Sequence, residues 1–545
     1  MIEVEVHQQL RALLRQQSDS QWTHHLTMAR LVARALRLGR SALIQTGTEA
    51  GSSAPYRLSY LMPLLVWDAP AIVVASESVQ QWLLQVELPR LQQWLDVSKS
   101  VQIITSNSTP TEFSGLSFVT PQLWLHDGLR PTGGHRLKSQ KIFPAGILTL
   151  IDGVDDLDTW VQEVLSLKIH GQDWDQLMLS HPSFRETIRD LRIRITHSLF
   201  QHPVNPYNCH VLEDDDRLPI YEMLSQLQQH LPLTESWTEL LNHLTPRPSI
   251  ASNRESNRES NRESLSAHTH DLGLLSAQVD RQSGTFTLQH SPIRLASLLR
   301  PIWQQQPTVL IGSALDLDAS ADTYRQTHGL DDLTCIKFSP PRHESCVQLY
   351  QPDRIPMPNT PQFQPALLSE LRQILSRSHI AAGLVVILVG DTPLRTQVGA
   401  TLAAEWGSRV QVDRIPEASN GILVAGWDEW SQFQQSGTVG APRCIVIATL
   451  PMPSLENPLV AARVKDYKQL RQDWFRLYLL PTALMAIQRA VFPVRSARGL
   501  VALLDSRVIH RIYGTQVLAA LSPYARLNYL DDRWNENWDD SGDDR

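Results

Sequence analysis

Short apolar runs alternate with amphipathic stretches along the first 150 residues, and this alternation predicts an α/β fold. Each run is bounded by polar or glycine-containing turns, which is typical of strands buried on both faces of a sheet. Between the runs, apolar residues recur at helical spacing, as in residues 28–36. The strands predicted here are 42–44, 71–76, 101–105, 116–120 and 146–151. Such an order predicts a parallel sheet covered by helices.

A second alternating set begins near residue 384 and predicts a second α/β unit. Its strands are 384–389, 408–412, 421–424, 444–448 and 500–504, and two more, 285–288 and 309–311, precede it. The stretch between the two sets is helical and rich in Gln, His and Leu. It includes three tandem copies of NRES at 253–264, which hold no apolar residue and so predict a solvated insertion.

These patterns divide the chain into five parts. We expect a first unit at 1–160, a helical insert at 161–270, a return to the first unit at 271–345, a second unit at 346–530 and an acidic tail at 531–545.

Composition adds little to this picture. The chain has 545 residues, a net charge of −7 and 19% charged residues, values of an ordinary globular protein without a general basic footprint. The four Cys form no C-x-x-C pair, so neither a structural zinc nor an iron–sulfur cluster is expected. We find no signal-peptide core and no apolar run long enough to cross a membrane, and we therefore predict a cytoplasmic protein.

Residues 44–63 carry the first candidate chemistry. An apolar strand ends in a turn rich in Gly, Thr and Ser, and a helical pattern follows, which is how a phosphate-binding loop presents its amides and a helix N-terminus. The candidate nucleotide-binding residues are Gly47, Thr48, Gly51, Ser52 and Ser53. No Lys stands where G-x-x-x-x-G-K-[ST] requires one, because the first Lys of the chain is Lys99.

The order of several further motifs resembles one family, the DinG-like branch of superfamily-2 DNA helicases, which is related to the XPD type. Residues 28–48 resemble its entry helix and phosphate-loop strand, and 76–91 the segment after its second strand. LTLIDGVDDL at 148–157 stands in place of its D-E-A-H box, and IGSAL at 311–315 in place of its S-A-T motif.

The C-terminal half carries the most specific part of the resemblance. Residues 450–463, LPMPSLENPLVAAR, resemble the signature L-P-F-x-x-P-x-x-P-L. Residues 487–514 resemble Q-x-x-G-R-x-I-R-S-x-x-D-x-G followed by D-x-R and Y-G. The resemblance covers nearly the whole chain apart from the NRES repeats and the tail. It implies two RecA-like units of the P-loop NTPase type with a helical insert in the first, ATP between the units, and single-stranded DNA across them.

The catalytic groups of such a motor are largely replaced. Asp152 stands where the resemblance implies a ligand for Mg²⁺, and Gln488 and Arg495 remain of the last motif. The Lys place holds Ser52 or Tyr56, the Glu of D-E-A-H is Gly153, and the G-R pair is Val491-Phe492. Because each lost charge costs a factor of about 10³–10⁵ in rate, losing Lys, Glu and Arg together predicts no useful hydrolysis.

Two functions therefore stay open. The first is a pseudo-helicase that binds nucleic acid or protein partners through the retained fold. The second is an active ATP-dependent DNA helicase with a rebuilt ATP and Mg²⁺ site, in which Arg57, Asp155 or Arg498 substitutes. Asp152 also has a purely structural interpretation as a cap after its strand, and Arg495 as an ion pair between the units.

The remaining features favour structural roles. The acidic run at 213–216 is typical of a solvated loop, and Cys209-His210 beside it lacks further metal ligands. His24 and His25 lie near the position where helicases place an adenine-contacting Gln, and we interpret them as helix-surface residues. Trp124 and Trp427 follow predicted strands and could stack on bases, but core positions are commoner for such residues.

Overall fold

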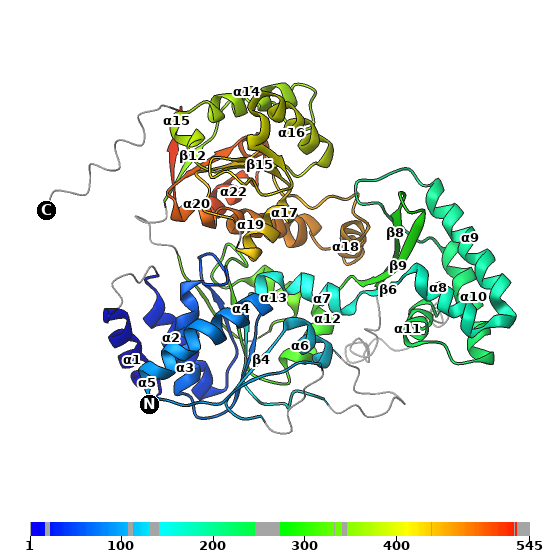
Figure 1. The fold of residues 1–545 in the computed structure, drawn as a ribbon, viewed down its shortest axis with the longest axis horizontal. Helices are drawn as coiled ribbons and strands as arrows, with labels where there is room; N and C mark the ends of the chain where they lie inside the picture. The colour runs from blue at the N-terminus through cyan, green and yellow to red at the C-terminus, as the bar shows by residue number, and fades with distance from the viewer. Residues whose placement is uncertain are drawn as a thin grey trace.

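The computed structural model describes residues 2–16, 22–106, 113–129, 141–245, 273–331, 333–339, 346–437, 439–527 and 529–530. The NRES repeats and the acidic tail lie outside the described residues, so the predictions made for them are not tested. Two α/β units, each built on a parallel sheet, lie one above the other in Figure 1, with a third, mostly helical part beside them.

The first unit is a seven-stranded parallel sheet in the order β11-β1-β10-β5-β2-β4-β3. Its strands are β1 (Ala42–Gln45), β2 (Ala71–Val74), β3 (Val101–Ile103), β4 (Leu116–Val119), β5 (Thr149–Asp152), β10 (Thr308–Gly312) and β11 (Thr334–Lys337). The predicted strands of this unit are confirmed, and β11 is additional. Both faces of the sheet are covered, which explains the uninterrupted apolar runs.

Two layers of helices cover this sheet. One layer consists of α1 (Ile2–Gln16), α2 (His25–Leu38), α3 (Leu58–Val66) and α5 (Leu88–Leu95), with α4 (Glu77–Trp82) leading into α5. The other consists of α6 (Pro121–Gly128), α7 (Leu157–Leu165), α12 (Ala296–Trp303) and α13 (Asp322–His328). Trp124 belongs to this second core, where it is buried and stacks on Trp303. The hypothesis that Trp124 stacks on bases is therefore wrong, because its ring is enclosed by the helix layer.

The second unit repeats this architecture in the order β14-β15-β13-β16-β17-β12-β18. Its strands are β12 (Val347–Tyr350), β13 (Val385–Leu388), β14 (Val410–Val412), β15 (Ile422–Ala425), β16 (Cys444–Ile447), β17 (Leu500–Leu503) and β18 (Tyr524–Leu527). One face packs on α14 (Phe363–Leu375) and α16 (Thr392–Trp406), the other on α17 (Trp427–Ser436), α19 (Leu480–Ala490), α20 (Phe492–Ser496) and α22 (Gly514–Leu521). The predicted two-unit α/β fold is confirmed.

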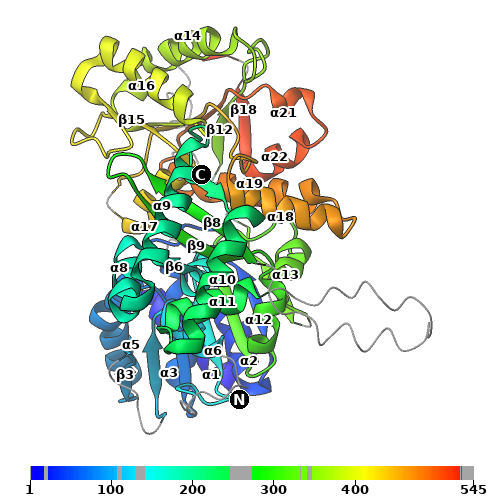
Figure 2. The same cartoon turned by 90° about the vertical axis from the view of Figure 1, so that its right-hand side faces the viewer.

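The part beside the two units contains a sheet that the sequence did not predict. Four antiparallel strands, β6 (Leu167–Ile169), β9 (Thr285–Pro292), β8 (Gly273–Asp280) and β7 (Cys209–Val211), pair in that order. They pack on α8 (Gly171–Ser180), α9 (Arg185–Gln201), α10 (Asp214–His230) and α11 (Glu235–Leu244), which Figure 2 shows in front. The strand predicted at 285–288 thus belongs to the insert and not to the return, because its partner is β8 across a hairpin.

Among the described residues, one helical stretch, Phe475–Ser496, is long and apolar enough to cross a membrane. It includes α19, whose apolar side packs into the core of the second unit. Such burial is typical of a core helix. From the second unit, α18 (Pro458–Gln469) extends to the insert and contacts β7 and β8.

Candidate functional site

The predicted phosphate-binding loop lies at the carboxyl edge of the first sheet, beside the turns after β5 and β10. Its first two amides are already bonded: Thr46 N–H donates to Gly312 O (2.8 Å) and Gly47 N–H to Ser313 O (3.0 Å). Both amides therefore face the end of β10 and are not free to meet a phosphate. Of the other predicted residues, Thr48, Gly51 and Ser52 are half-buried and Ser53 is exposed.

The guanidinium of Arg57 fills the inside of this loop. It donates to the backbone carbonyls of Ala50 (3.0 Å), Gly51 and Ser52 (2.9 Å), and its Nε donates to Asp152 Oδ2 (2.7 Å). The side chain is 2% exposed. Burial opposes its charge, but Asp152 more than compensates and the pKa of Arg57 is raised. A loop that directs three carbonyls at an internal cation cannot direct the corresponding amides at a phosphate.

Asp152, the predicted Mg²⁺ ligand, is fully engaged by the same helical turn. Tyr56 Oη donates to its Oδ1 (2.7 Å), and Tyr60 Oη and Arg57 Nε donate to its Oδ2 (2.9 and 2.7 Å). Burial, together with the carboxylate of Asp152, raises the pKa of both tyrosines well above the usual value against the opposing effect of Arg57, so both stay hydroxyl donors. The carboxylate is 1% exposed. Its two oxygens thus serve an internal ion pair, and the arrangement does not fit Mg²⁺, which prefers open carboxylates and keeps several waters.

The turn after β5 is tied to the turn after β10. Asp155, at the His place of D-E-A-H, accepts from Ser313 N–H (2.7 Å), Ser313 Oγ (2.7 Å) and Ala314 N–H (2.9 Å). Ser313 and Ala314 belong to the S-A-T-like segment. Both segments could be recognised in the sequence, but the contact between them could not. Gly153, at the Glu place, has φ +91°, a left-handed conformation that favours glycine.

The two remnants of the last motif are far from equivalent. Gln488 lies at the junction of the units, where its Oε1 accepts from Lys337 Nζ (3.3 Å). Arg495 instead lies within the second unit and donates to the carbonyls of residues 521, 522 and 523. Its burial lowers the pKa of the guanidinium to about 10. Its described contacts are therefore those of a structural residue, and they lie away from the loop.

An aromatic cluster occupies the side of the loop where the resemblance implies adenine. His24 stacks on Phe338 with ring centroids 4.9 Å apart, and Trp22 packs edge-on against both rings. The neighbouring His25 is buried, not on the surface, and its Nδ1 lies 2.8 Å from Ser59 Oγ. Trp22 and Phe338 lie far apart in the chain, so their contact could not be recognised from the sequence.

The cavity that remains beside the loop is small, about 200 Å³. Its walls are formed by the loop, by the turn after β5 and by the second unit, where Phe492 stands in place of the motif arginine. Glu49 also lines it, and burial raises the pKa of this carboxyl group. Sites for small ligands usually measure about 300–1,000 Å³. Neither the volume nor an acidic wall suits a nucleoside triphosphate.

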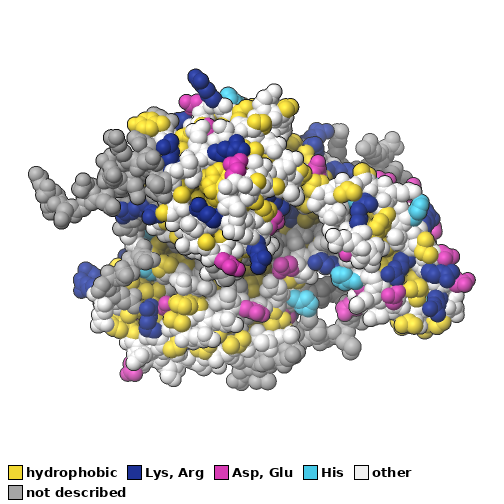
Figure 3. All heavy atoms as spheres, turned by 45° about the horizontal axis from the view of Figure 1, so that its top comes forward, with side chains coloured by type: hydrophobic (Ala, Val, Ile, Leu, Met, Phe, Trp, Pro, Cys, Tyr) yellow, Lys and Arg dark blue, Asp and Glu magenta, His cyan; other side chains and the backbone are white. Residues whose placement is uncertain are grey.

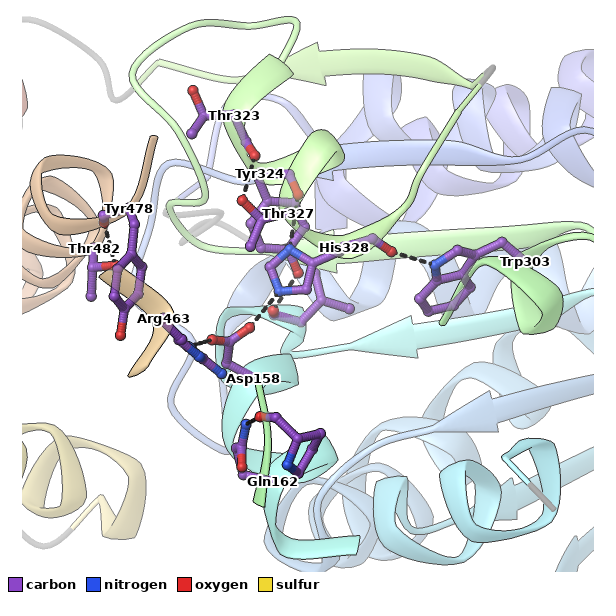
Figure 4. A network of polar contacts seen from close by, with 12 residues as sticks. Asp158, Gln162, Trp303, Thr323, Tyr324, Thr327, His328, Arg463, Tyr478 and Thr482 are labelled. Atoms are coloured by element: carbon purple, nitrogen blue, oxygen red, sulfur yellow. Dashed lines mark hydrogen bonds and ion pairs between the residues drawn. The ribbon is translucent and has the colours of Figure 1, made fainter. Parts of the chain in front are cut away.

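Charged side chains join the two units next to this cavity. Arg489 on α19 donates to Asp156 (2.8 Å), which also accepts from Gln435 Nε2 (3.0 Å). Arg463 on α18 donates to Asp158 (2.9 Å), whose second oxygen lies 2.8 Å from His328 Nε2, as Figure 4 shows.

The arginines that join the units at this junction are each paired with a carboxylate. Burial would raise the pKa of Asp158, but Arg463 and His328 together hold it well below the usual range. A third contact is bidentate, from Arg294 to Asp466 (2.7 and 2.6 Å). Figure 3 shows acidic and basic side chains together where the units meet.

The remaining candidates have structural roles. Trp427 Nε1 donates to Thr449 O (3.1 Å) at the end of β16. Asp216, in the acidic run, is buried in the first turn of α10 and accepts from Ser198 Oγ (2.9 Å). Asp214 and Asp215 are exposed in the same turn, and Glu213 precedes it at the N-cap position. Within the described residues, no group of three or more His, Cys, Asp or Glu side chains is placed to hold a metal ion.

Comparisons with known proteins agree with the motifs. The chain is 26% identical over 256 residues to the ATP-dependent DNA helicase YoaA of Escherichia coli, and 22% identical over 233 residues to that of Haemophilus influenzae. These matches cover 44% and 41% of this chain but only 40% and 36% of the relatives. No protein-family profile matches the chain.

Solved structures agree on the fold. Xpd4 of S. tokodaii superposes with a TM-score of 0.55 at 12% identity, over 92% of this chain and 99% of that one. An XPD structure in its apo form gives 0.54 at 11% identity, over 92% and 100%. At such identities the likeness establishes the architecture alone.

Proposed function

We propose that this chain, a DinG- and XPD-related member of helicase superfamily 2, is a pseudo-helicase that binds nucleic acid without hydrolysing ATP. The observation that carries the proposal is the position of Arg57. Its guanidinium donates to the loop carbonyls of residues 50–52 and forms an ion pair with Asp152. The Arg57 side chain therefore fills the place of the phosphates and binds the carboxylate that would hold the metal ion. The residues present do not fit Mg²⁺·ATP, and we derive no step through it.

Nucleic-acid binding rests on kinship. The sequence match to YoaA and the two-unit fold support single-stranded DNA as the ligand, and protein partners fit a module that has kept the fold without the motor. We place such a module in the cytoplasm. If DNA binding does not depend on a nucleotide cycle, the affinity would stay constant or would be controlled by the salt concentration and by competing partners.

One observation favours the alternative, an active helicase with a rebuilt ATP site. Asp155 still links the D-E-A-H-like turn to Ser313. In a motor, this connection would couple ATP hydrolysis to movement along the nucleic-acid strand. The three candidate substitutes are poorly placed, however. Arg57 is bound to Asp152, and Asp155 is bound to residues 313 and 314. Arg498 precedes β17, at the amino end of this strand in the second sheet.

The test combines nucleotide binding with hydrolysis. We expect no change of the thermal unfolding midpoint with millimolar ATP·Mg²⁺ and no phosphate release with single-stranded DNA, whereas a bound ligand at 100 times its Kd would add about 2.7 kcal/mol. Asp152→Ala is the control: it abolishes phosphate release in a rebuilt motor and changes only stability in a pseudo-helicase. DNA-stimulated release that Asp152→Ala removes would overturn the proposal.

A further inference from the structure

The first two helices carry most of their charge with one sign. In the described residues up to 40, all six arginines are exposed, and only two acidic residues, Glu3 and Glu5, accompany them. The arginines are Arg11, Arg15, Arg30, Arg34, Arg37 and Arg40. The whole chain, in contrast, has a net charge of −7. A basic helix pair on an acidic protein is a local feature that neither the fold nor the closed loop explains.

Three of these arginines line one groove. Arg30, Arg34 and Arg37 are spaced by four and three residues and so share one face of α2. Together with Val4, His7 and Leu31 they border a groove of about 600 Å³ between α1 and α2. Arg37 pairs with Glu3 (2.7 Å), which fixes the start of α1 beside the end of α2. Among the described residues, Arg30 and Arg34 have no ion-pair partner.

The junction of the two units has the opposite character. The largest cavity described there, about 660 Å³, is lined by five acidic residues against two arginines. The acids are Asp155, Asp156, Asp158, Glu163 and Asp428, and the arginines are Arg463 and Arg489. Both arginines are already paired with Asp158 and Asp156. A polyanion is repelled by such walls and is attracted to a basic surface.

We propose that the α1–α2 surface, centred on Arg30, Arg34 and Arg37, binds the phosphate backbone of single-stranded nucleic acid. The inference rests on the proposed function and names a surface for it, on the outer helix layer of the first unit at the lower left of Figure 1. Arginine suits this role because its planar fork binds phosphate oxygens in pairs. The surface would recognise the negative charge of the phosphates, and the proposal includes no contact with the bases.

The experiment measures the affinity of the full chain for a labelled 20-nucleotide oligo-dT across a salt series. The test variant is Arg30→Gln/Arg34→Gln. The control is Arg185→Gln/Arg189→Gln on α9, which has the same spacing, the same exposure and the same change of net charge. Thermal midpoints check that both variants fold.

We expect the test variant to lose at least tenfold in affinity at about 0.1 M salt. Its slope of log K against log salt should fall by about 1.4, since each phosphate contact on a single strand contributes about 0.7. The control variant should stay within twofold, and Arg30→Lys/Arg34→Lys should keep most of the slope.

Four outcomes would overturn the inference. Equal losses in the two Gln variants would mean that only bulk charge matters. An unchanged test variant of a chain that does bind oligo-dT would leave nucleic-acid binding standing but move it to another surface. Competition by poly-glutamate as strong as by oligo-dT, at equal charge, would indicate an acidic protein segment as the partner. Absence of any binding by the unaltered chain at low salt would refute nucleic-acid binding itself, whatever the ATP tests show.

Discussion

The guanidinium of Arg489 lies 2.8 Å from the carboxylate of Asp156, and this pair joins the second unit to the turn after β5 in the first. The resemblance places ATP between these two units. Here an ion pair stands at that junction, next to Arg463–Asp158 and Arg294–Asp466. Ion pairs between the chain's own side chains therefore join the two units.

Removing these contacts should loosen the two units. We expect Arg489→Ala/Arg463→Ala to increase the radius of gyration in small-angle X-ray scattering and to raise its dependence on salt. Each charged hydrogen bond lost weakens the junction by about 1.5–3 kcal/mol. Arg372→Ala is the control, because its pair with Glu405 is exposed and lies inside the second unit. A double variant with unchanged dimensions would mean that apolar packing alone holds the units.

Arg57 and Asp152 should be coupled in stability. Arg57→Met leaves a buried carboxylate without its cation, and we expect it to cost about 3–5 kcal/mol in urea unfolding. Arg57→Met/Asp152→Asn should cost less than Arg57→Met alone, since the uncompensated charge is gone. If the double variant is the less stable of the two, the pair is not the unit that closes the loop.

The fold could be predicted from the sequence because parallel strands that are buried on both faces consist of continuous runs of apolar residues. Some of the missed strands are short edge strands, such as β6 and β7, whose three residues are too few to show an alternation. The internal strand β8, with eight residues, was missed as well. The replacement of the Lys and the Glu of the motor motifs was visible at Ser52 and Gly153. The closure of the loop was not, because nothing in the order of residues tells that the Arg57 side chain turns back onto the carbonyls of its own loop.

Two buried histidines should make stability fall in mild acid. Burial lowers the pKa of His25 to about 4 and, with the neighbouring His243, that of His290 to about 3. Between these values and 6.5 the unfolded chain binds protons that the folded chain does not, so the free energy of unfolding falls as the pH falls through this window.

Each of these histidines should lower the free energy of unfolding by about 2 kcal/mol between pH 7 and pH 5. Urea unfolding at the two pH values measures it. We expect His25→Asn and His290→Asn each to flatten the difference, whatever they do to stability at pH 7. Profiles parallel to that of the unaltered chain would show that the two rings already take up protons in the folded state.

Restoring the missing Glu should not restore the motor. Gly153 has φ +91°, so Gly153→Glu forces a side chain into the left-handed region, at a cost of about 1–2 kcal/mol. The new carboxylate would also stand beside Asp152 and Asp155, while the Lys and Arg of a motor remain absent. Gly284→Glu, on the β8–β9 turn at φ +69° with open space around it, measures the backbone cost alone. We expect Gly153→Glu to be the less stable of the two and to release no phosphate with single-stranded DNA. Phosphate release by this variant would show that the loop can still open around ATP, with Arg57 displaced.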